Sequence, residues 1–470
     1  MSLSAALGQS RAGLAAVSVW AEATSANISN ADRRDYVRAD VRRDIGPDGG
    51  LIGARVFRER TDVIDGLLRT ASAGEQRQDA IASNLSLYVA RLGQPGDAGS
   101  LGSGLAALET AFANLAAAPE QSGHQVATLD AADSLSRTFR EISTALADTE
   151  ARVREKVAIS VGEFNAGLRE ARAGLAQGPD ASSDAARDGS LTARLSSLGA
   201  LADVRVDTDA SGRITLHTPS GALLSDGGDV ASIRFDASSG RLFAEGLVGQ
   251  VEITPGAPGA RGFENGRLAG EIELLNDILP RMRDQLDQLA GGVIAAFEGA
   301  DGTLAAGDAG LFTDAGASLG AGVTPGLAQR IAVNDAVRPE AGGALWRLRD
   351  GLSATAPGPV GASAQVSAFV DALETPRAFD PAAQLPPQAS LADYAGALVT
   401  RQAQAMFGAE DRRDTAAGRI ATLSSSRDAV VGVDVDAELQ TLLRIEQSYA
   451  ANSRVIQSLT EMFDRLLAAT

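Results

Sequence analysis

One short motif in this 470-residue chain has the spacing of a catalytic serine. Gly316-Ala-Ser318-Leu-Gly320 matches the nucleophile elbow of serine hydrolases, in which a sharp strand-to-helix turn presents the serine to a histidine that follows later in the chain. The two histidines here, His124 and His217, both precede Ser318, and the surrounding residues are mostly Gly and Ala. A loop is the better interpretation, and an extracellular hydrolase that uses Ser318 is the alternative from another class.

The sequence also offers little to a metal ion. The stretch 207–212 resembles the start of a calcium loop, but the twelfth position, where a bidentate Glu is needed, is Thr218. Alternating apolar residues flank this stretch, so we expect a hairpin turn. The chain has no cysteine and no HExxH motif, and no spacing singles out a carboxylate pair among its 60 acidic residues. We therefore predict no catalytic residue, no metal site and no cofactor.

The composition favours a folded protein of several domains. Hydrophobic residues make up 44% and charged residues 22% of a chain that is too long for one core. The net charge of −18 argues against a nucleic-acid partner, because phosphate contacts need Lys and Arg. No run of 18 apolar residues is present, and the first 30 residues lack the basic start of a signal peptide. We expect neither membrane insertion nor a cleaved signal peptide.

The two ends of the chain have helical patterns with an apolar stripe. At both ends, apolar residues recur at heptad spacing, which predicts a seam that pairs with another helix. Asn452 is the one polar member of the C-terminal seam, and such a residue commonly fixes the register. We predict an assembly interface formed by the seam residues Leu7, Leu14, Val17, Ile28, Leu442, Ile445, Tyr449, Asn452, Ile456, Leu459, Phe463 and Leu466. The alternative is two core helices of an ordinary globular bundle, but seams at the two extreme termini favour an elongated subunit.

The residues between the seams combine helical and strand patterns. Helical spacing covers 75–92, 103–177, 265–297 and 390–425, whereas 203–254 alternates with period two and predicts β-hairpins. We expect short helices at 343–352 and 363–374, and linkers at 180–188 and 376–387.

These patterns predict an α+β fold. The expected molecule is elongated and multidomain, with paired, coiled-coil-like terminal helices, a long-helix bundle domain and an inserted β-rich domain. The expected order is an N-terminal helix at 1–35, the first part of the helical domain at 36–190, a β-rich unit at 191–262, a central helix of the helical domain at 263–298, a variable Gly- and Pro-rich part with short helices at 299–387, the last part of the helical domain at 388–434 and a C-terminal helix at 435–470.

Several motifs resemble those of flagellar axial proteins. Ser25-Ala-Asn-Ile-Ser-Asn30 with Tyr36-Val-Arg38 is similar to the N-terminal signature of rod, hook and hook-associated proteins. Gly432-Val-Asp-Val-Asp-Ala-Glu438 and the stretch 447–456 are similar to their C-terminal signature. Within the chain, Phe112-Ala-Asn-Leu-Ala-Ala-Ala-Pro119 and the stretches 268–290 and 390–399 resemble the hook-filament junction members of the hook-associated family.

This resemblance implies a structural component of the flagellum, not an enzyme. It implies a protein that joins hook to filament outside the cell and leaves the cell through the flagellar type III export system. The implied partners are the hook protein, the filament-side junction protein, further copies of the chain in a ring, and an export chaperone at the C-terminal region. The alternative within this class is a hook or distal-rod axial protein, which shares both termini but would be β-rich between them.

Overall fold

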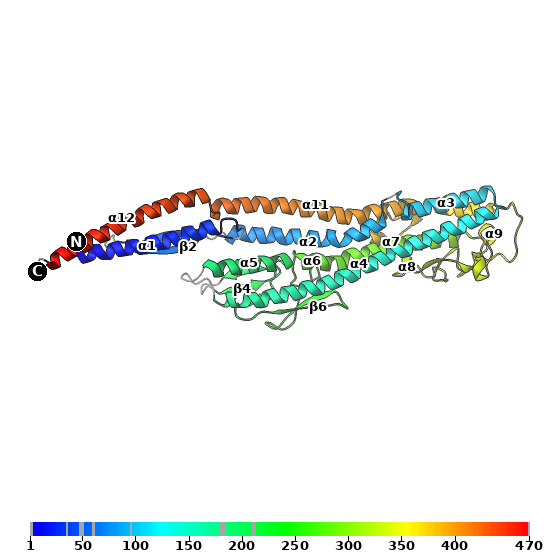
Figure 1. The fold of residues 1–470 in the computed structure, drawn as a ribbon. Helices are drawn as coiled ribbons and strands as arrows, with labels where there is room; N and C mark the ends of the chain where they lie inside the picture. The colour runs from blue at the N-terminus through cyan, green and yellow to red at the C-terminus, as the bar shows by residue number, and fades with distance from the viewer. Residues whose placement is uncertain are drawn as a thin grey trace.

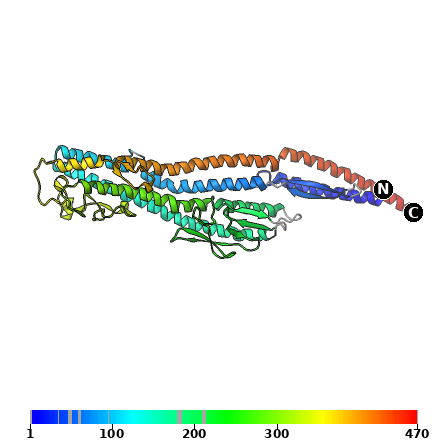
Figure 2. The same ribbon diagram turned by 180° about the vertical axis from the view of Figure 1, so that it is seen from behind.

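The computed structural model describes residues 3–33, 36–46, 51–58, 62–94, 96–177, 185–208 and 213–468. The molecule is elongated, with a narrow segment at one end and a broader part that makes up the rest (Figure 1). The narrow segment, here the terminal rod, contains helix α1 (Leu3–Ser29), strands β1 (Ala39–Ile45) and β2 (Leu51–Arg58), and helix α12 (Val435–Ala468). The remaining residues, 62–431, form the body. Both chain ends lie at the tip of the terminal rod (Figures 1 and 2).

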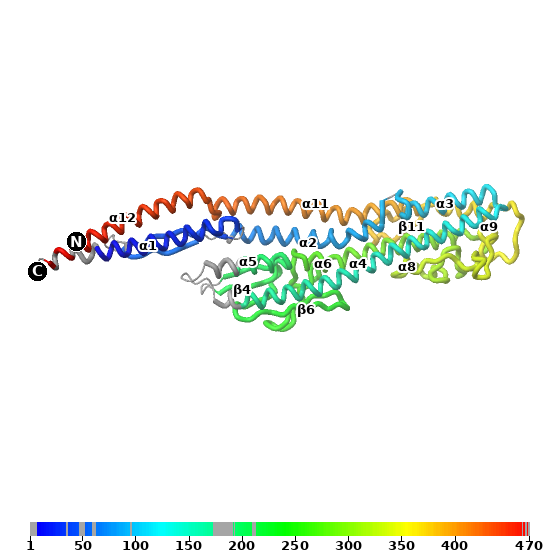
Figure 3. Tube along the Cα trace, in the orientation of Figure 1, coloured from blue at the N-terminus to red at the C-terminus, as the bar shows by residue number. Residues whose placement is uncertain are grey.

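Long helices give the body its length. Helices α2 (Asp62–Leu92) and α11 (Leu391–Val431) run side by side, and α3 (Leu101–Ala117), α4 (Ser122–Gln177) and α7 (Leu279–Ala300) continue the bundle (Figure 3). Ser100 and Ser390 cap α3 and α11, because each hydroxyl accepts a hydrogen bond from the backbone N–H three residues later, at 3.2 and 3.1 Å. No helix in the described ranges is both long and apolar enough to cross a bilayer.

The helix expected at 265–297 is present but locally unwound. Helix α6 (Arg267–Glu273) leads into a π-helical turn (Leu274–Ile278) and then into α7. Pro280 lies in the first turn of α7, and its missing N–H cannot complete the α-helical ladder there, which explains the break. Farther along α7, the ring centroid of Phe297 lies 5.4 Å from that of Phe112 and 5.2 Å from that of Phe369. Three helices therefore meet in one aromatic cluster.

The predicted hairpins form two three-stranded antiparallel sheets. One contains β3 (Arg205–Thr208), β4 (Ile214–His217) and β5 (Leu223–Ser225), and the other β6 (Ser232–Asp236), β7 (Arg241–Glu245) and β8 (Val251–Glu252). The second sheet is fastened to α4 by Asn165, whose side chain bonds both the N–H and the carbonyl of Ile233, at 2.7 and 2.8 Å. The sheets therefore share the core of the helical bundle.

Two expected linkers differ in the structure. Residues from Ala185 onward belong to a helix, α5 (Ala185–Leu201), whose Leu195 and Leu198 are buried; residues 178–184 lie outside the described ranges. The part expected to be β-rich from residue 191 thus begins with a helix, because these leucines follow helical spacing. The Pro-rich stretch 376–387 also packs on the body: Phe379 stacks on Tyr394 with ring centroids 3.9 Å apart.

The segment between α7 and α11 contains only short elements. Its strands and α-helices are β9 (Phe312–Asp314), α8 (Leu327–Arg330), β10 (Ile331–Val333), α9 (Arg347–Asp350), α10 (Ala364–Glu374), β11 (Arg377–Ala378) and β12 (Gln388–Ala389), and three single turns of 3-10 helix lie between them. Helices α9 and α10 confirm the short helices expected at 343–352 and 363–374.

Candidate assembly interface

The terminal rod consists of three layers, with α1 in the middle. Helix α12 lies along one side of α1, and the β1–β2 hairpin lies along another (Figure 1). The hairpin is antiparallel, with Val41 opposite Val56. It lies within the segment 36–190 that was expected to be the first part of the helical domain, but it packs on α1. The opposite face of α12 is open to solvent, so the rod presents a helix that is covered on one side only.

Helix α1 buries its predicted seam unevenly. Val17 is buried, together with Ser10 and Thr24, which are seven residues away on either side. Leu7, Leu14 and Ile28 are only half-buried. The stripe of small and polar residues is thus buried more deeply than the large apolar residues. Helix α12 and the hairpin both pack on α1, and small side chains on α1 allow both to approach its backbone closely.

The seam of α12 is covered only in part. Ile445 and Leu459 are buried, Leu442, Asn452 and Ile456 are half-buried, and Tyr449 is 52% exposed. Asn452 faces Gly13 of α1, where an added Cβ would lie 3.4 Å from the amide. The side chains of Phe463 and Leu466 lie outside the described residues. The structure thus brings the two terminal seams together within one chain.

Asn27 fastens the end of α1 to the start of the hairpin. Its amide Nδ2 donates to the Ala39 carbonyl at 2.9 Å, and its Oδ1 accepts from the Ala39 N–H at 2.8 Å and from the Tyr36 hydroxyl at 2.9 Å. The side chain is almost completely buried. Three hydrogen bonds from one buried amide set the direction in which the chain leaves the helix.

The two terminal motifs meet at the junction of rod and body. The Arg38 guanidinium donates to the Glu438 carboxylate at 2.6 Å, and the Arg38 N–H donates to the carbonyl of Val431, the last residue of α11. Glu438 is buried, so its charge needs this partner. The hydrogen bond to Glu438 raises the pKa of Arg38. Asp434 caps α12 by accepting from the N–H groups of Asp436 and Ala437.

Sequence reasoning did not place Asn27, Arg38 and Glu438 in the interface. All three lie within the two terminal motifs, but helical periodicity gives no signal for them, since they act where elements end. Their partners are distant in sequence: Arg38 and Glu438 are separated by 400 residues.

The open face of α12 is apolar near its N-terminal end. Leu439 and Leu443, one helical turn apart, are 45% and 59% exposed, and Val435 and Tyr449 are also exposed. A group of large exposed apolar side chains on one helix marks an interaction surface.

The residues of the serine-hydrolase and calcium-loop motifs do not have the arrangement that these sites require. Ser318 lies in a loop after β9, and the next helix, α8, begins only at Leu327. His124 lies in α4 and His217 in β4. The turn at 209–212 of the calcium-like motif lies outside the described residues. Within the described ranges, no group of three or more His, Asp or Glu side chains is placed to hold a metal ion.

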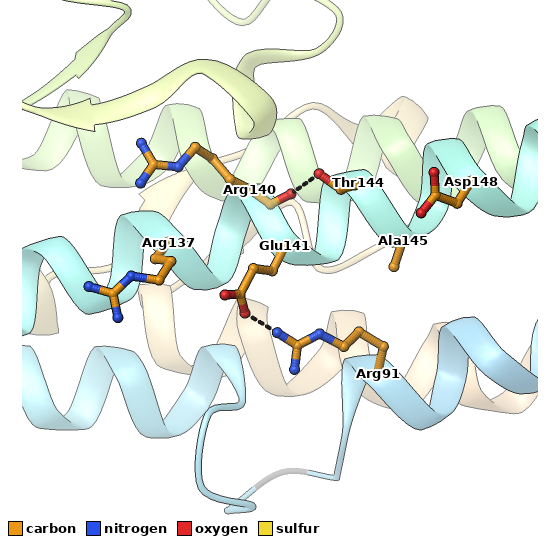
Figure 4. Close-up of a pocket in the computed structure, with 7 residues that line it drawn as sticks. All are labelled: Arg91, Arg137, Arg140, Glu141, Thr144, Ala145 and Asp148. Atoms are coloured by element: carbon orange, nitrogen blue, oxygen red, sulfur yellow. Dashed lines mark hydrogen bonds and ion pairs between the residues drawn. The ribbon is translucent and has the colours of Figure 1, made fainter.

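A shallow groove between α2 and α4 holds charged side chains (Figure 4). Arg91 of α2 donates to the Glu141 carboxylate of α4, and Arg137 lies on the same side of α4, whereas the Arg140 side chain points away from the pair. The Thr144 hydroxyl donates to the Arg140 carbonyl at 2.8 Å, so it is engaged by the backbone of its own helix. The groove residues include no histidine. The groove therefore holds an inter-helix ion pair.

Comparisons with known proteins agree with this geometry. A family model for the flagellar hook-associated protein FlgK helical domain matches residues 91–310, which lie in the body. A model for the flagellar basal body rod FlgEFG protein C-terminal matches residues 429–469, which include α12. A comparison with curated proteins gave no match.

One solved structure is similar in part. The flagellar hook junction protein FlgK from Burkholderia pseudomallei is 17% identical, with a TM-score of 0.45, and the match covers 53% of this chain and 46% of that one. The chain thus contains a region that matches the helical domain of the flagellar hook-associated protein FlgK and a C-terminal region that matches flagellar basal body rod proteins.

Proposed function

We propose that this protein joins the hook of the bacterial flagellum to its filament, as a structural component and not as an enzyme. The observation that supports this most is the match of the FlgK helical domain to residues 91–310. That match lies within the helical body and includes α3, α4 and α7, and the match of a basal-body rod C-terminal model to 429–469 includes α12 of the terminal rod. The protein combines a body of the junction type with the terminus of an axial subunit.

The terminal rod supplies the assembly interface in this proposal. Within one chain, α1 covers Ile445 and Leu459 of α12. The exposed side chains Leu439, Leu443 and Tyr449 are then available for contact with a neighbouring subunit. Burial of large apolar side chains contributes about 1.5–3 kcal/mol each. Neighbouring copies that cover this face would close the subunits into a ring.

The remaining partners follow from the same family. We infer contacts with the hook protein on one side and with the filament-side junction protein on the other. We also infer export through the flagellar type III system without a cleaved signal peptide, with a chaperone bound to the C-terminal region. The location is then the flagellum outside the cell, and neither nucleic acid nor membrane insertion takes part.

A hook or distal-rod protein is the second candidate, because a rod-type model matches the C-terminal residues. Such a protein would be β-rich between its termini. Here α3 and α4 fill 101–177 almost completely, which favours the junction protein.

Deletion of the gene tests the proposal. Cells that lack this protein should build hooks without filaments, as seen by electron microscopy of hook-basal bodies, and the wild-type gene should restore filaments. Absence of the hook itself would support the rod or hook alternative. Normal filaments on the deletion strain would contradict both.

A further inference from the structure

Glu271 is a carboxylic acid inside the body with incomplete hydrogen bonding. It lies on α6, where α2 and α4 pack against that helix, and only 1% of its surface is exposed. Its Oε1 accepts a 3.2 Å hydrogen bond from the Ser160 hydroxyl of α4, and its Oε2 has no hydrogen-bond partner among the described residues. A buried carboxylate with one free oxygen is costly, whereas a protonated carboxyl group is much less so.

No cation forms an ion pair with Glu271 in the described part of the chain. Lys156 of α4 donates to Asn84 instead, at 2.7 Å, and Arg267 of α6 binds the carboxylate of Glu163. Arg77, which faces α6 from α2, binds Glu273 at 2.9 Å. Burial raises the pKa of Glu271 to about 7, although the Ser160 hydroxyl opposes the shift.

The helices around Glu271 are packed too closely to move apart and admit water to an ionised carboxylate. Gly270, the preceding residue, lies against the Arg77 carbonyl so tightly that an added Cβ would be 2.4 Å away. The π-helical turn begins three residues after Glu271. The carboxyl group is thus held at a point where α2, α4 and α6 are in contact and where the helix that bears it is already irregular.

We propose that Glu271 makes the folding of the body depend on a proton, so that the ionised chain unfolds more readily and is easier to export. A group with a raised pKa stabilises the folded state fully below its unfolded value, about 4.5, and this stabilisation is lost as the pH rises to about 7. Above about pH 7 the folded body carries the cost of the buried charge. The part concerning export rests on the function proposed above.

Urea unfolding of the purified full-length protein between pH 5 and pH 8 tests the proton dependence. The ratio of folded to unfolded protein should fall on the order of a hundredfold more in the wild type than in Glu271→Gln over this interval. Glu155→Gln, which removes an exposed carboxylate from α4, should behave as the wild type does. Equal pH dependence of all three proteins would overturn the proposal.

Ser160→Ala provides a second test that leaves Glu271 in place. Among the described residues, the Ser160 hydroxyl is the one group that donates to Glu271 and favours its ionised form. Without it, stability should be lost at a higher pH than in the wild type. An unchanged pH profile would contradict a proton on Glu271.

Export is measured separately, as the amount of protein secreted by cells that express each variant. Glu271→Gln should be secreted more slowly than Glu155→Gln, because its body is more stable at neutral pH. Equal secretion, with the pH dependence in urea intact, would overturn the role in export alone.

Discussion

At the scale of single residues, Asn27 joins the end of α1 to the start of β1 by three hydrogen bonds. Replacing it with Ala leaves the N–H and carbonyl of Ala39 and the Tyr36 hydroxyl without their partner. We expect a loss of about 2–4 kcal/mol of local stability, because unpaired buried polar groups cost about 1–3 kcal/mol each. Hydrogen exchange should accelerate in β1 and β2 and stay unchanged in α4. Ser25→Ala, at an exposed position of the same helix, is the control, and an unchanged hairpin in Asn27→Ala would contradict the prediction.

A second residue, Gly432, sets the path of the chain from body to rod. A Cβ at this position would lie 2.3 Å from the carbonyl oxygen of Asp428, so Gly432→Ala must shift the end of α11. We expect a destabilisation of about 1–3 kcal/mol, typical of overpacking, and a changed angle between rod and body. Small-angle scattering should report a different maximum dimension. Gly418→Ala, where a Cβ meets open space within α11, should leave the scattering curve as it is.

At the scale of elements, the pairing of α1 with α12 can be separated from the fold of the body. Leu459 is buried on α12, and the continuous buried core of the protein does not include α1 or α12. Leu459→Asp places a charge in the seam and should cost several kcal/mol of pairing energy, on the order of a large core substitution. The main thermal transition should keep its midpoint, while limited proteolysis should remove α12.

Ser458→Asp adds the same charge at the exposed neighbouring position and should resist proteolysis as the wild type does. If Leu459→Asp unfolds the body, the terminal helices belong to an ordinary globular core. If it is secreted and builds normal filaments, the seam is not an assembly element.

At the scale of the whole molecule, the body should fold without the rod. Residues 62–431 contain every member of the continuous core, from Ile81 to Ala409. A chain limited to these residues should unfold cooperatively near the wild-type temperature, because it keeps its buried area. It should also fail to assemble on hooks, since α1 and α12 are missing. Its incorporation at hook tips, seen by electron microscopy, would show that the body alone is sufficient.

The sequence determined the parts of this protein that depend on local order. Heptad spacing predicted the terminal helices, period-two alternation predicted the hairpins, and the motifs at both ends indicated a flagellar axial protein, because each signal lies within a few turns or strands of chain. The missed helix α5 was also local, but its Leu195 and Leu198 adjoin a polar stretch that resembles a linker.

Only the tertiary structure decided which distant residues meet and which faces are covered. Arg38 contacts Glu438 across 400 residues, and Glu271 is buried where three helices converge, with one oxygen that has no hydrogen-bond partner in the described part of the chain. Along α1, the residues around Val17 are covered more deeply than Leu7, Leu14 and Ile28, because a hairpin and a helix enclose α1 from two sides. Periodicity identifies the apolar side of a helix, but the depth of burial depends on what packs against it.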